Sequence, residues 1–500
     1  MRLLGAAFLS FVVTASVACS DDEACKEPCT SATVVMTTYG DGAGFFDAPF
    51  PSDARRDENG RPIVTGFPNP QAIALVDSVL AILEKDQDGF GLASGAFFRT
   101  TAALDAASLP TLAGSVEPTS SVQLIGISKG APDYLKRYPV RVSFAVDPGP
   151  YGAPNLLSVV PLQGVPLRAE TRYAVVITKS VKDTSGAALG VSSATADLIA
   201  GKSPAGMSEA GATAHNVFTE LAEAGIAKDD IAAFTVFTTG DPISVQAASI
   251  TKAREDGVPT PIAPFTKTDD FADFCVYAST IDMPVYQSGT PPYSSEGGGF
   301  VIDADGRPVL QRQERANFVV TVPKRNMPAD GYPLVVFSRT GGGGERPLVD
   351  RGVRAESGGE AIEPGTGPAL EFARVGFGGA SIDGPHGGLR NVTHDDEQLL
   401  VFNFQNPLAL RDNIRQSALE LALVPHILDG IEIDVSDCAG AVAPLDLARF
   451  QAKALMGHSM GASIAPLAIA FEPRYEALIL SGAGGSFIEN MLHKQTPLPV

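Results

Sequence analysis

A serine between two glycines, Gly457-His-Ser459-Met-Gly461, is the feature of this sequence with the clearest chemical meaning. A short apolar run from Lys453 to Met456 precedes it, and small helix-forming residues follow it. This order is typical of a nucleophile elbow, in which a sharp turn from strand to helix lifts the serine hydroxyl above the edge of a sheet. Glycine on either side leaves room for the turn. The sequence therefore predicts Ser459 as a nucleophile.

A nucleophilic serine needs hydrogen-bond donors for the oxyanion that forms when it attacks a carbonyl group. The backbone N–H of Met460, at the start of the helix expected after Ser459, is one predicted donor. Four consecutive glycines follow the apolar run at 334–337, and the N–H groups of Gly341 and Gly342 are the other predicted donors. No metal site and no cofactor are predicted, because histidine and cysteine do not cluster as zinc ligands do.

Composition narrows the class of protein. The 500 residues are 44% hydrophobic and 19% charged, which is enough apolar sequence for two or three globular domains. The net charge of −20 argues against a partner nucleic acid and against a basic face that binds anionic lipid. Cysteine is sparse, and in an oxidising compartment Cys275 and Cys438 are candidates for a disulfide.

The N-terminus has the pattern of an export signal. Arg2 precedes an apolar run that is too short for a comfortable membrane span, so residues 1–18 are predicted to be a signal peptide. The small residue before Cys19 resembles a bacterial lipobox, which predicts lipidation of Cys19 and a membrane anchor. The alternative is an ordinary cleaved signal with a cysteine nearby. Residues 19–40 are predicted to be a polar tether.

Two changes of pattern along the chain predict two domains. Short alternating strands separated by turn residues indicate a β-sandwich with an inserted helix over 41–250. A basic, proline-rich stretch at 251–269 is predicted to be a linker. Over 270–500, strands alternate with helices, which indicates a mostly parallel sheet with helices on both faces.

The predicted elements follow from apolar periodicity and turn residues. Strands are expected at 96–99, 122–127, 140–146, 156–161, 173–178 and 234–239, and then at 299–303, 318–322, 334–337, 377–382, 454–456 and 477–480. Helices are expected at 71–85, 208–224, 368–375, 406–428 and 460–471. In the longest helix, Asn406 is the expected N-cap and Pro407 the first helical residue.

Several phrases of the second predicted domain resemble the α/β-hydrolase superfamily. They are the glycine loop after 334–337, Ile382-Asp383-Gly-Pro-His386-Gly387, Asn406-Pro-Leu-Ala-Leu-Arg411, Gly457-His-Ser-Met-Gly461 and Leu480-Ser-Gly-Ala-Gly-Gly485. The chain is most similar to bacterial exported lipases and esterases that carry an N-terminal Ig-like region. This resemblance implies an Ig-like sandwich followed by an α/β-hydrolase domain. The chain departs from its relatives at Arg339-Thr340, where they commonly have His-Gly.

The resemblance also implies a triad of serine, histidine and acid. In this superfamily the acid and the histidine follow the serine along the chain, so Asp383 and His386 are expected to shape the loop near the site instead. Past the strand expected at 477–480, Glu489 and His493 are the only acid and imidazole, and groups so close in sequence are poorly placed to align with a serine. We therefore expect the triad partners beyond residue 500 and an incomplete hydrolase domain.

Together these features predict an exported serine hydrolase that acts on carboxylic esters through an acyl-enzyme at Ser459. Its predicted partners are a small-molecule or lipid ester and a membrane reached by the lipid anchor. Two alternatives stay open. One is a serine peptidase of the same fold, because the elbow does not separate esters from amides. The other is a surface binding protein with a degenerate hydrolase domain.

Overall fold

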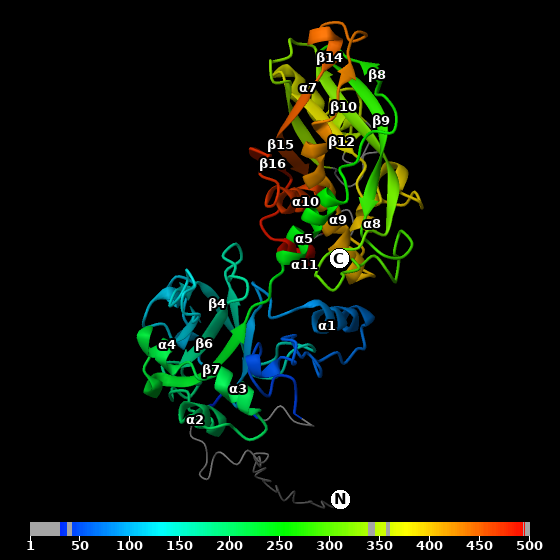
Figure 1. The fold of residues 1–500 in the computed structure, drawn as a ribbon. Coiled ribbons are helices and arrows are strands. Elements are labelled where there is room, and N and C mark those ends of the chain that lie inside the picture. Colours follow the sequence, from blue (N-terminus) through cyan, green and yellow to red (C-terminus); the bar gives the residue numbers. More distant parts are fainter. Residues whose placement is uncertain (1–30, 38–42, 339–345, 357–360, 494, 496–500) are drawn as a thin grey trace, which may run out of the picture.

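The structure is a computed structural model that describes residues 31–37, 43–338, 346–356, 361–493 and 495. An N-terminal lobe rich in antiparallel strands is followed by a C-terminal lobe built on a larger sheet (Figure 1). The predicted signal peptide, Cys19, Gly341 and Gly342 lie outside the described residues. None of the helices in the described part of the chain combines the length and the apolar character of a transmembrane span.

Two antiparallel sheets pack against each other in the N-terminal lobe. The first has the order β1–β5–β4, with bounds Ala96–Arg99, Leu156–Pro161 and Val140–Ala145. The second has the order β3–β2–β6–β7, with bounds Arg137–Tyr138, Val122–Gly126, Arg172–Thr178 and Ile231–Thr238. Alternate residues of β6 serve two cores: Tyr173 and Val175 face the first sheet, while Ala174 and Val176 face the helices behind.

Helices cover the outer face of the second sheet. They are α2 (Ser193–Ile199), α3 (Glu209–Ala214) and α4 (Phe218–Glu223). The single helix expected at 208–224 is therefore two, because Val217 leaves helical geometry at φ −123° and ψ 18°. An immunoglobulin sandwich pairs its second strand with its fifth, whereas β2 here pairs with β3 and β6. The sandwich is observed, but the Ig-like order is not confirmed.

The described residues nearest the N-terminus correct another expectation. Residues 31–37, predicted as part of a polar tether, pack into the N-terminal lobe: Val34 is 1% exposed and bridges Thr100, and the N–H of Ala32 donates to Asp183. Their apolar side chains are buried because they complete the core between the two sheets. Helix α1 (Ala74–Asp86) forms close to its expected position.

The C-terminal lobe contains a seven-stranded sheet with the order β16–β15–β11–β12–β10–β9–β8. The strands are β8 (Thr266–Asp270), β9 (Phe274–Val285), β10 (Arg312–Pro323), β11 (Tyr332–Ser338), β12 (Gly378–Ile382), β15 (Phe450–His458) and β16 (Ala477–Ser481). Strands β12, β11, β15 and β16 are parallel, but β8, β9 and β10 pair antiparallel. The sheet is thus less parallel than predicted, because β9 and β10 form a long antiparallel pair. The strand expected at 299–303 provides only isolated bridges.

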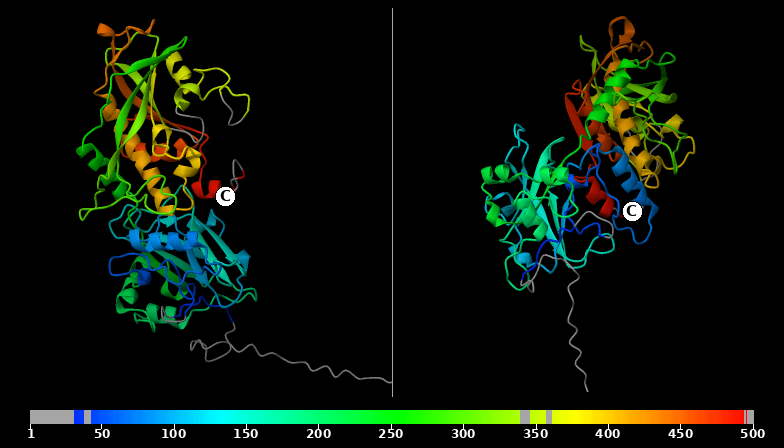
Figure 2. Two further views of the ribbon diagram at one scale, coloured as in Figure 1. Left: turned by 90° about the vertical axis from the view of Figure 1, so that its right-hand side faces the viewer. Right: turned by 60° about the horizontal axis from the view of Figure 1, so that its bottom comes forward.

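Helices pack on both faces of this sheet, as predicted. One face is covered by α5 (Ser244–Glu255), α9 (Pro407–Leu428) and α10 (Met460–Ile469), and the other by α6 (Pro347–Asp350) and α7 (Pro368–Arg374). Short elements α8 (Glu397–Val401), β13 (Ile433–Asp434), β14 (Leu447–Ala448) and α11 (Phe487–His493) complete the lobe. The two lobes and the helices between them can be followed in Figure 2.

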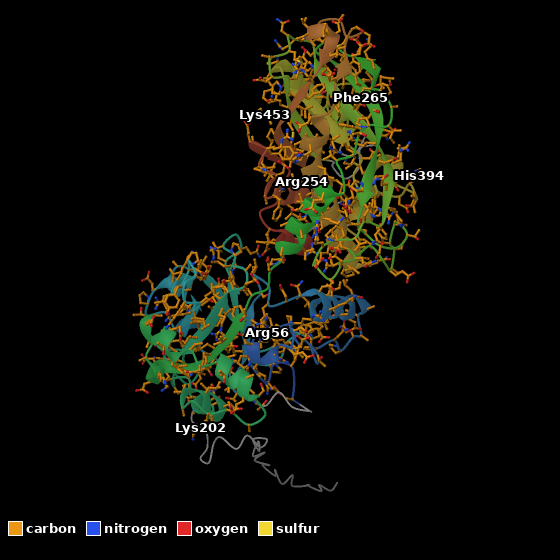
Figure 3. The ribbon with its side chains drawn as sticks, viewed as in Figure 1. Arg56, Lys202, Arg254, Phe265, His394 and Lys453 are labelled. Atoms are coloured by element: carbon orange, nitrogen blue, oxygen red, sulfur yellow. A yellow bond between two sulfur atoms is a disulfide. The ribbon has the colours of Figure 1, made fainter. Side chains whose placement is uncertain are left out.

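The segment expected as a linker, 251–269, is partly regular structure. Helix α5 continues to Glu255 and β8 begins at Thr266. Arg254 of α5, which is labelled in Figure 3, pairs with the buried carboxylate of Glu472 and so fixes α5 to the C-terminal lobe. Apolar Ile250 and Ala253 enter the core beneath the sheet, and this burial explains why the stretch is ordered.

One further expectation is confirmed, and one question that the sequence left open is answered. The side chain of Asn406 accepts a hydrogen bond from the N–H of Ala409, and Pro407 is the first residue of α9. Cys275 at the start of β9 and Cys438 form a disulfide across a sequence separation of 163 residues. This bridge lies at the end of the sheet where the parallel strands begin, opposite the end at which Ser459 follows β15.

Candidate active site

Ser459 occupies the turn between β15 and α10 and has φ 54° and ψ −115°, a conformation that non-glycine residues rarely adopt. Gly457 explains how the turn closes: a Cβ there would lie 2.3 Å from the carbonyl oxygen of Gly461. Only glycine permits this approach of backbone to backbone. Strained backbone of this kind is found where it holds a reactive side chain in place. The strand, the turn and the helix expected around Ser459 are all present.

Hydrogen bonds fix the backbone of this turn to the neighbouring strand. The N–H of Ser459 donates to the carbonyl of Ser481 at 2.9 Å, and the N–H of Ala462 donates to the carbonyl of Ser459 at 2.9 Å. Met460 is the first residue of α10, so its N–H has no partner inside the helix. The positive end of the helix dipole therefore lies next to Ser459, where an oxyanion would gain stability.

His458 lies beside the serine but turns to the next strand. Its Nδ1 forms a hydrogen bond with the Ser481 hydroxyl at 2.9 Å. Burial, together with the charge of Arg351, lowers the pKa of His458, so its ring is neutral at neutral pH. The ring thus holds β16 against β15 and is not in contact with the Ser459 hydroxyl.

No catalytic base contacts the serine within the described residues. The Ser459 hydroxyl has no hydrogen-bond partner in that part of the chain. His493, on α11, pairs with Glu489 at 3.1 Å, and its side chain is 76% exposed. We expected Glu489 and His493 to be poorly placed for catalysis, and they pair with each other on the exposed surface of α11. The structure therefore brings neither of them to Ser459.

Asp383 and His386 hold the loop after β12. The Asp383 carboxylate accepts hydrogen bonds from the N–H groups of Asn317 at 2.9 Å and Leu389 at 3.1 Å. His386 has a positive φ of 59° and is 3% exposed, and its Nε2 donates to the side-chain oxygen of Asn413 at 3.2 Å. These buried contacts agree with the expected role in shaping the loop.

A buried ion network next to this loop was not foreseen from the sequence. Arg390 donates to both oxygens of Glu420 on α9, at 2.7 and 3.0 Å, and to Glu314 on β10 at 2.8 Å. Burial alone would lower the pKa of Arg390, but the carboxylates of Glu420 and Glu314 raise it above its usual value. Burial also raises the pKa of Glu420, and Arg390 opposes that shift. The network ties the loop after β12 to the helix and the sheet beneath it.

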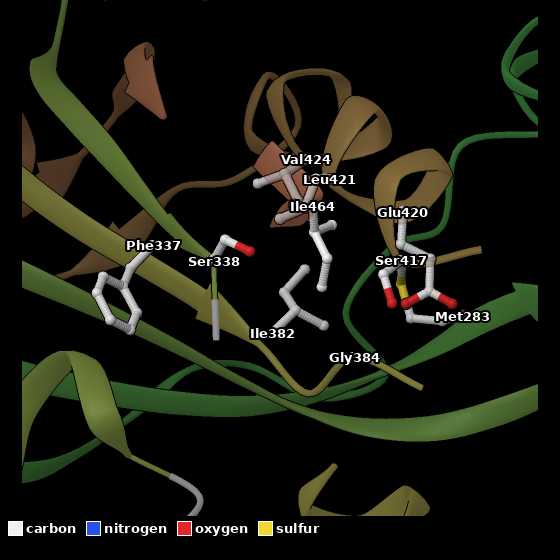
Figure 4. Close-up of a pocket in the computed structure, with 10 residues that line it drawn as sticks. All are labelled: Met283, Phe337, Ser338, Ile382, Gly384, Ser417, Glu420, Leu421, Val424 and Ile464. Atoms are coloured by element: carbon white, nitrogen blue, oxygen red, sulfur yellow. The ribbon is translucent and has the colours of Figure 1, made fainter. Parts of the chain in front are cut away.

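A small cavity of about 20 Å³ lies between the sheet and α9 (Figure 4). Ser338 and Ile382 line it at the ends of β11 and β12, with Glu420 of α9 and Ile464 of α10 on the other side. A space of this size holds at most one water molecule. It is therefore a packing defect behind the site and not a place for a substrate.

A larger pocket of about 530 Å³ lies beside the elbow. Ala462 and Ser463, in the first turn of α10, form one wall, and Ala483 and Gly484, just after β16, form another. Pockets at the carboxyl ends of parallel strands are the usual ligand sites of open α/β sheets. Among the described residues, no group of three histidine, cysteine or acidic side chains is placed to hold a metal ion.

Comparisons with known proteins give no family assignment. No protein-family model matches the chain, and no curated protein matches it. Among solved structures, acetyl xylan esterase 1 from Thermoanaerobacterium sp. matches with 13% identity and a TM-score of 0.27, over 51% of this chain and 67% of that one. A Bacteroides fragilis protein provisionally assigned as an acetyl xylan esterase matches with 13% identity and a TM-score of 0.28, over 47% and 51%.

A glucuronoyl esterase from Solibacter usitatus matches with 14% identity and a TM-score of 0.20, over 47% of this chain and 56% of that one. This chain thus spans about half to two thirds of the length of these structures. TM-scores this low do not establish a common fold. The site is therefore interpreted from its own geometry.

Proposed function

We propose that the protein is a serine hydrolase of carboxylic esters with Ser459 as its nucleophile. The observation that carries the proposal is the backbone of Ser459, φ 54° and ψ −115°, in a tight turn from a buried parallel strand into a helix. A serine held in this way exposes its hydroxyl at the sheet edge and next to the helix N-terminus. The α/β-hydrolase fold is part of the same proposal and is supported by the order of strand, turn and helix.

The proposed reaction has two steps. The Ser459 oxygen attacks the ester carbonyl as its proton passes to a base, and the alcohol then leaves with a proton and an acyl-enzyme remains. Water releases the acid by the same route. The N–H of Met460 supports the tetrahedral oxyanion, with Gly341 and Gly342 as the further donors that the sequence predicts.

Two other functions stay candidates. A serine peptidase would use the same elbow, because the turn does not distinguish an ester from an amide. A binding protein with a degenerate site is favoured by one observation, namely that no imidazole contacts Ser459 within the described residues. Labelling with a fluorophosphonate probe separates the binding protein from either hydrolase, because the probe reacts only with an activated serine.

The decisive measurement compares the wild-type protein with Ser459→Ala. We expect the probe to label only the wild type, and we expect hydrolysis of p-nitrophenyl esters to fall on the order of 10⁶-fold in the variant when the triad is complete. Labelling of Ser459→Ala would show that another serine is the nucleophile. Wild-type protein that cleaves a peptide anilide faster than the matching ester would favour the peptidase.

Export as a lipoprotein anchored through Cys19 belongs to the same proposal. The small residues before Cys19 support it, and so does the disulfide between Cys275 and Cys438, since such bonds persist in oxidising compartments. Stable anchoring needs more than one acyl chain. Cells fed an alkynyl fatty acid should label the wild type and not Cys19→Ala, and equal labelling of the two would overturn the idea.

A further inference from the structure

The pocket beside the elbow has an apolar floor. Phe402 and, from the first turns of α9, Leu410 and Ile414 line one side, and Pro466 and Leu467 of α10 line the other. Ser459 precedes α10 directly, so the pocket wall at Ser463 is about one helical turn, roughly 5–6 Å of rise, from the nucleophile. Part of a substrate bound at Ser459 can therefore extend into this pocket.

The charged residues that line the pocket are both cationic. They are Arg411 and Arg415, and among the described residues no aspartate or glutamate lines the pocket with them. This is unexpected in a chain with a net charge of −20. Arg411 is occupied, because it donates to Asp412 from Nε at 2.8 Å and from Nη2 at 3.0 Å, and to Asp86 of α1 from Nη1 at 2.8 Å.

Within the described part of the chain, the Arg415 side chain donates one hydrogen bond, from Nη1 to Asp412 at 3.1 Å. A guanidinium carries five N–H groups, so this contact leaves donors of Arg415 for a ligand. The side chain is 18% exposed, and it faces the pocket. Burial lowers the pKa of Arg415, and the carboxylate of Asp412 opposes this shift. A planar carboxylate would match its free donors in a two-pronged contact.

We propose that this pocket binds a free carboxylate on the substrate through Arg415, so that the preferred substrates are half-esters of dicarboxylic acids with an apolar spacer. The inference rests on the proposed hydrolase function and names the substrate class of that site. The ester carbonyl lies at Ser459, the hydrocarbon spacer contacts Leu410 and Ile414, and the carboxylate meets Arg415.

Binding to the Ser459→Ala protein tests this without turnover. Calorimetry would compare the monomethyl and dimethyl esters of succinate, adipate and suberate, which differ in charge at each length. We expect at least one monomethyl ester to bind about tenfold to a hundredfold more tightly than its dimethyl partner, the usual gain from a hydrogen bond to a charged group. Equal affinity within every pair, or no binding at all, would overturn the proposal.

Variants locate the effect. Arg415→Gln should abolish the preference for the charged ester, and Arg374→Gln, an exposed arginine on α7, should keep it. Ser463→Asp adds a negative charge to the pocket wall without altering Arg415, and it should also abolish the preference, whereas Ser463→Asn should retain it. If Arg415→Gln does not fold, the Ser463 pair still decides the question. A preference that survives in Ser463→Asp would overturn the proposal.

The two proposals fail separately. Selective binding by a protein that never labels with a fluorophosphonate would overturn the hydrolase function and leave a carboxylate-binding pocket. Labelling and ester turnover without any preference for the charged esters would leave the hydrolase function and overturn the assignment of the pocket.

Discussion

Replacing Gly457 by alanine tests the geometry of the turn that carries Ser459. A Cβ at this position would lie 2.3 Å from the carbonyl oxygen of Gly461, 2.6 Å from its carbonyl carbon and 2.9 Å from the nitrogen of Ala462. All three are backbone atoms, so no side-chain rotation relieves the overlap and the turn must open. The expected loss is about 1–3 kcal/mol in the free energy of unfolding, the usual cost of overpacking.

The rate should fall more than the stability. A displacement of about 1 Å at a reacting group costs on the order of 100-fold in rate. We therefore expect Gly457→Ala to react with a fluorophosphonate on the order of 100-fold more slowly than the wild type, with Tm lower by a few degrees. Gly485→Ala is the matched control, because a Cβ at Gly485 meets no atom within 4 Å.

Both measurements use the wild type as the reference. Gly485→Ala should melt and react as the wild type does, since its side chain enters open space. If Gly457→Ala also melts and reacts as the wild type does, the close approach of the two backbones is not what holds Ser459, and the reasoning about the turn is refuted.

Three other predictions concern stability. Cys275→Ser removes a bridge across 163 residues and should lower the free energy of unfolding by about 2–5 kcal/mol, measured by urea denaturation without reductant; an unchanged midpoint would contradict this. Glu420→Gln removes a carboxylate that balances the charge of buried Arg390 and should lower the free energy of unfolding by about 3–5 kcal/mol. The exposed control Arg374→Gln should lower it by less than about 1 kcal/mol, and equal losses would contradict the buried network. Burial lowers the pKa of His215, so its neutral ring contributes fully to the free energy of unfolding above about pH 6.5, and this contribution is lost as the pH falls below that value. His215→Gln should therefore show a smaller loss of Tm on acidification than the wild type. An equal loss in the two proteins would contradict the assignment.

The elbow was predictable from the sequence because its signals are local. The glycines flank the serine directly, the apolar run before them forms β15, and the small residues after them form α10. The start of α9 was equally readable, since Asn406 and Pro407 act within one turn of the helix. Signals of this kind need no knowledge of what the segment packs against.

Strand β9 and the beginning of β10 were not predicted, because their strand structure depends on the hydrogen bonds that they form with each other more than on a local pattern of apolar residues. Strand β9 contains Asp282 and Pro284, which interrupt an apolar run, and β10 begins with the charged stretch Arg312 to Arg315. Each strand satisfies the backbone of the other along twelve residue pairs. Aspartate and proline are depleted in strands, as are glutamate and other charged residues to a lesser degree, so the last residues of β9 and the first residues of β10 give only a weak local strand signal.

The chemistry around the site was less predictable than the turn. Charged residues in a sequence indicate solvent exposure, yet Arg390 and Glu420 meet in the core. Arg415 looks like any surface arginine on a helix until α9, α10 and the segment after β16 come together around one pocket. Such sites depend on tertiary contacts between distant segments, which local periodicity does not encode.

The disulfide between Cys275 and Cys438 divides the C-terminal lobe into two ends with different properties. The covalent bond holds the end of the sheet at which the parallel strands begin, while the elbow and the pocket lie at the other end and depend on hydrogen bonds and packing alone. The lifetime of the fold and the geometry of the proposed active site can therefore be changed separately. A reducing environment would shorten the lifetime of the fold and leave the geometry at Ser459 intact for as long as the fold persists.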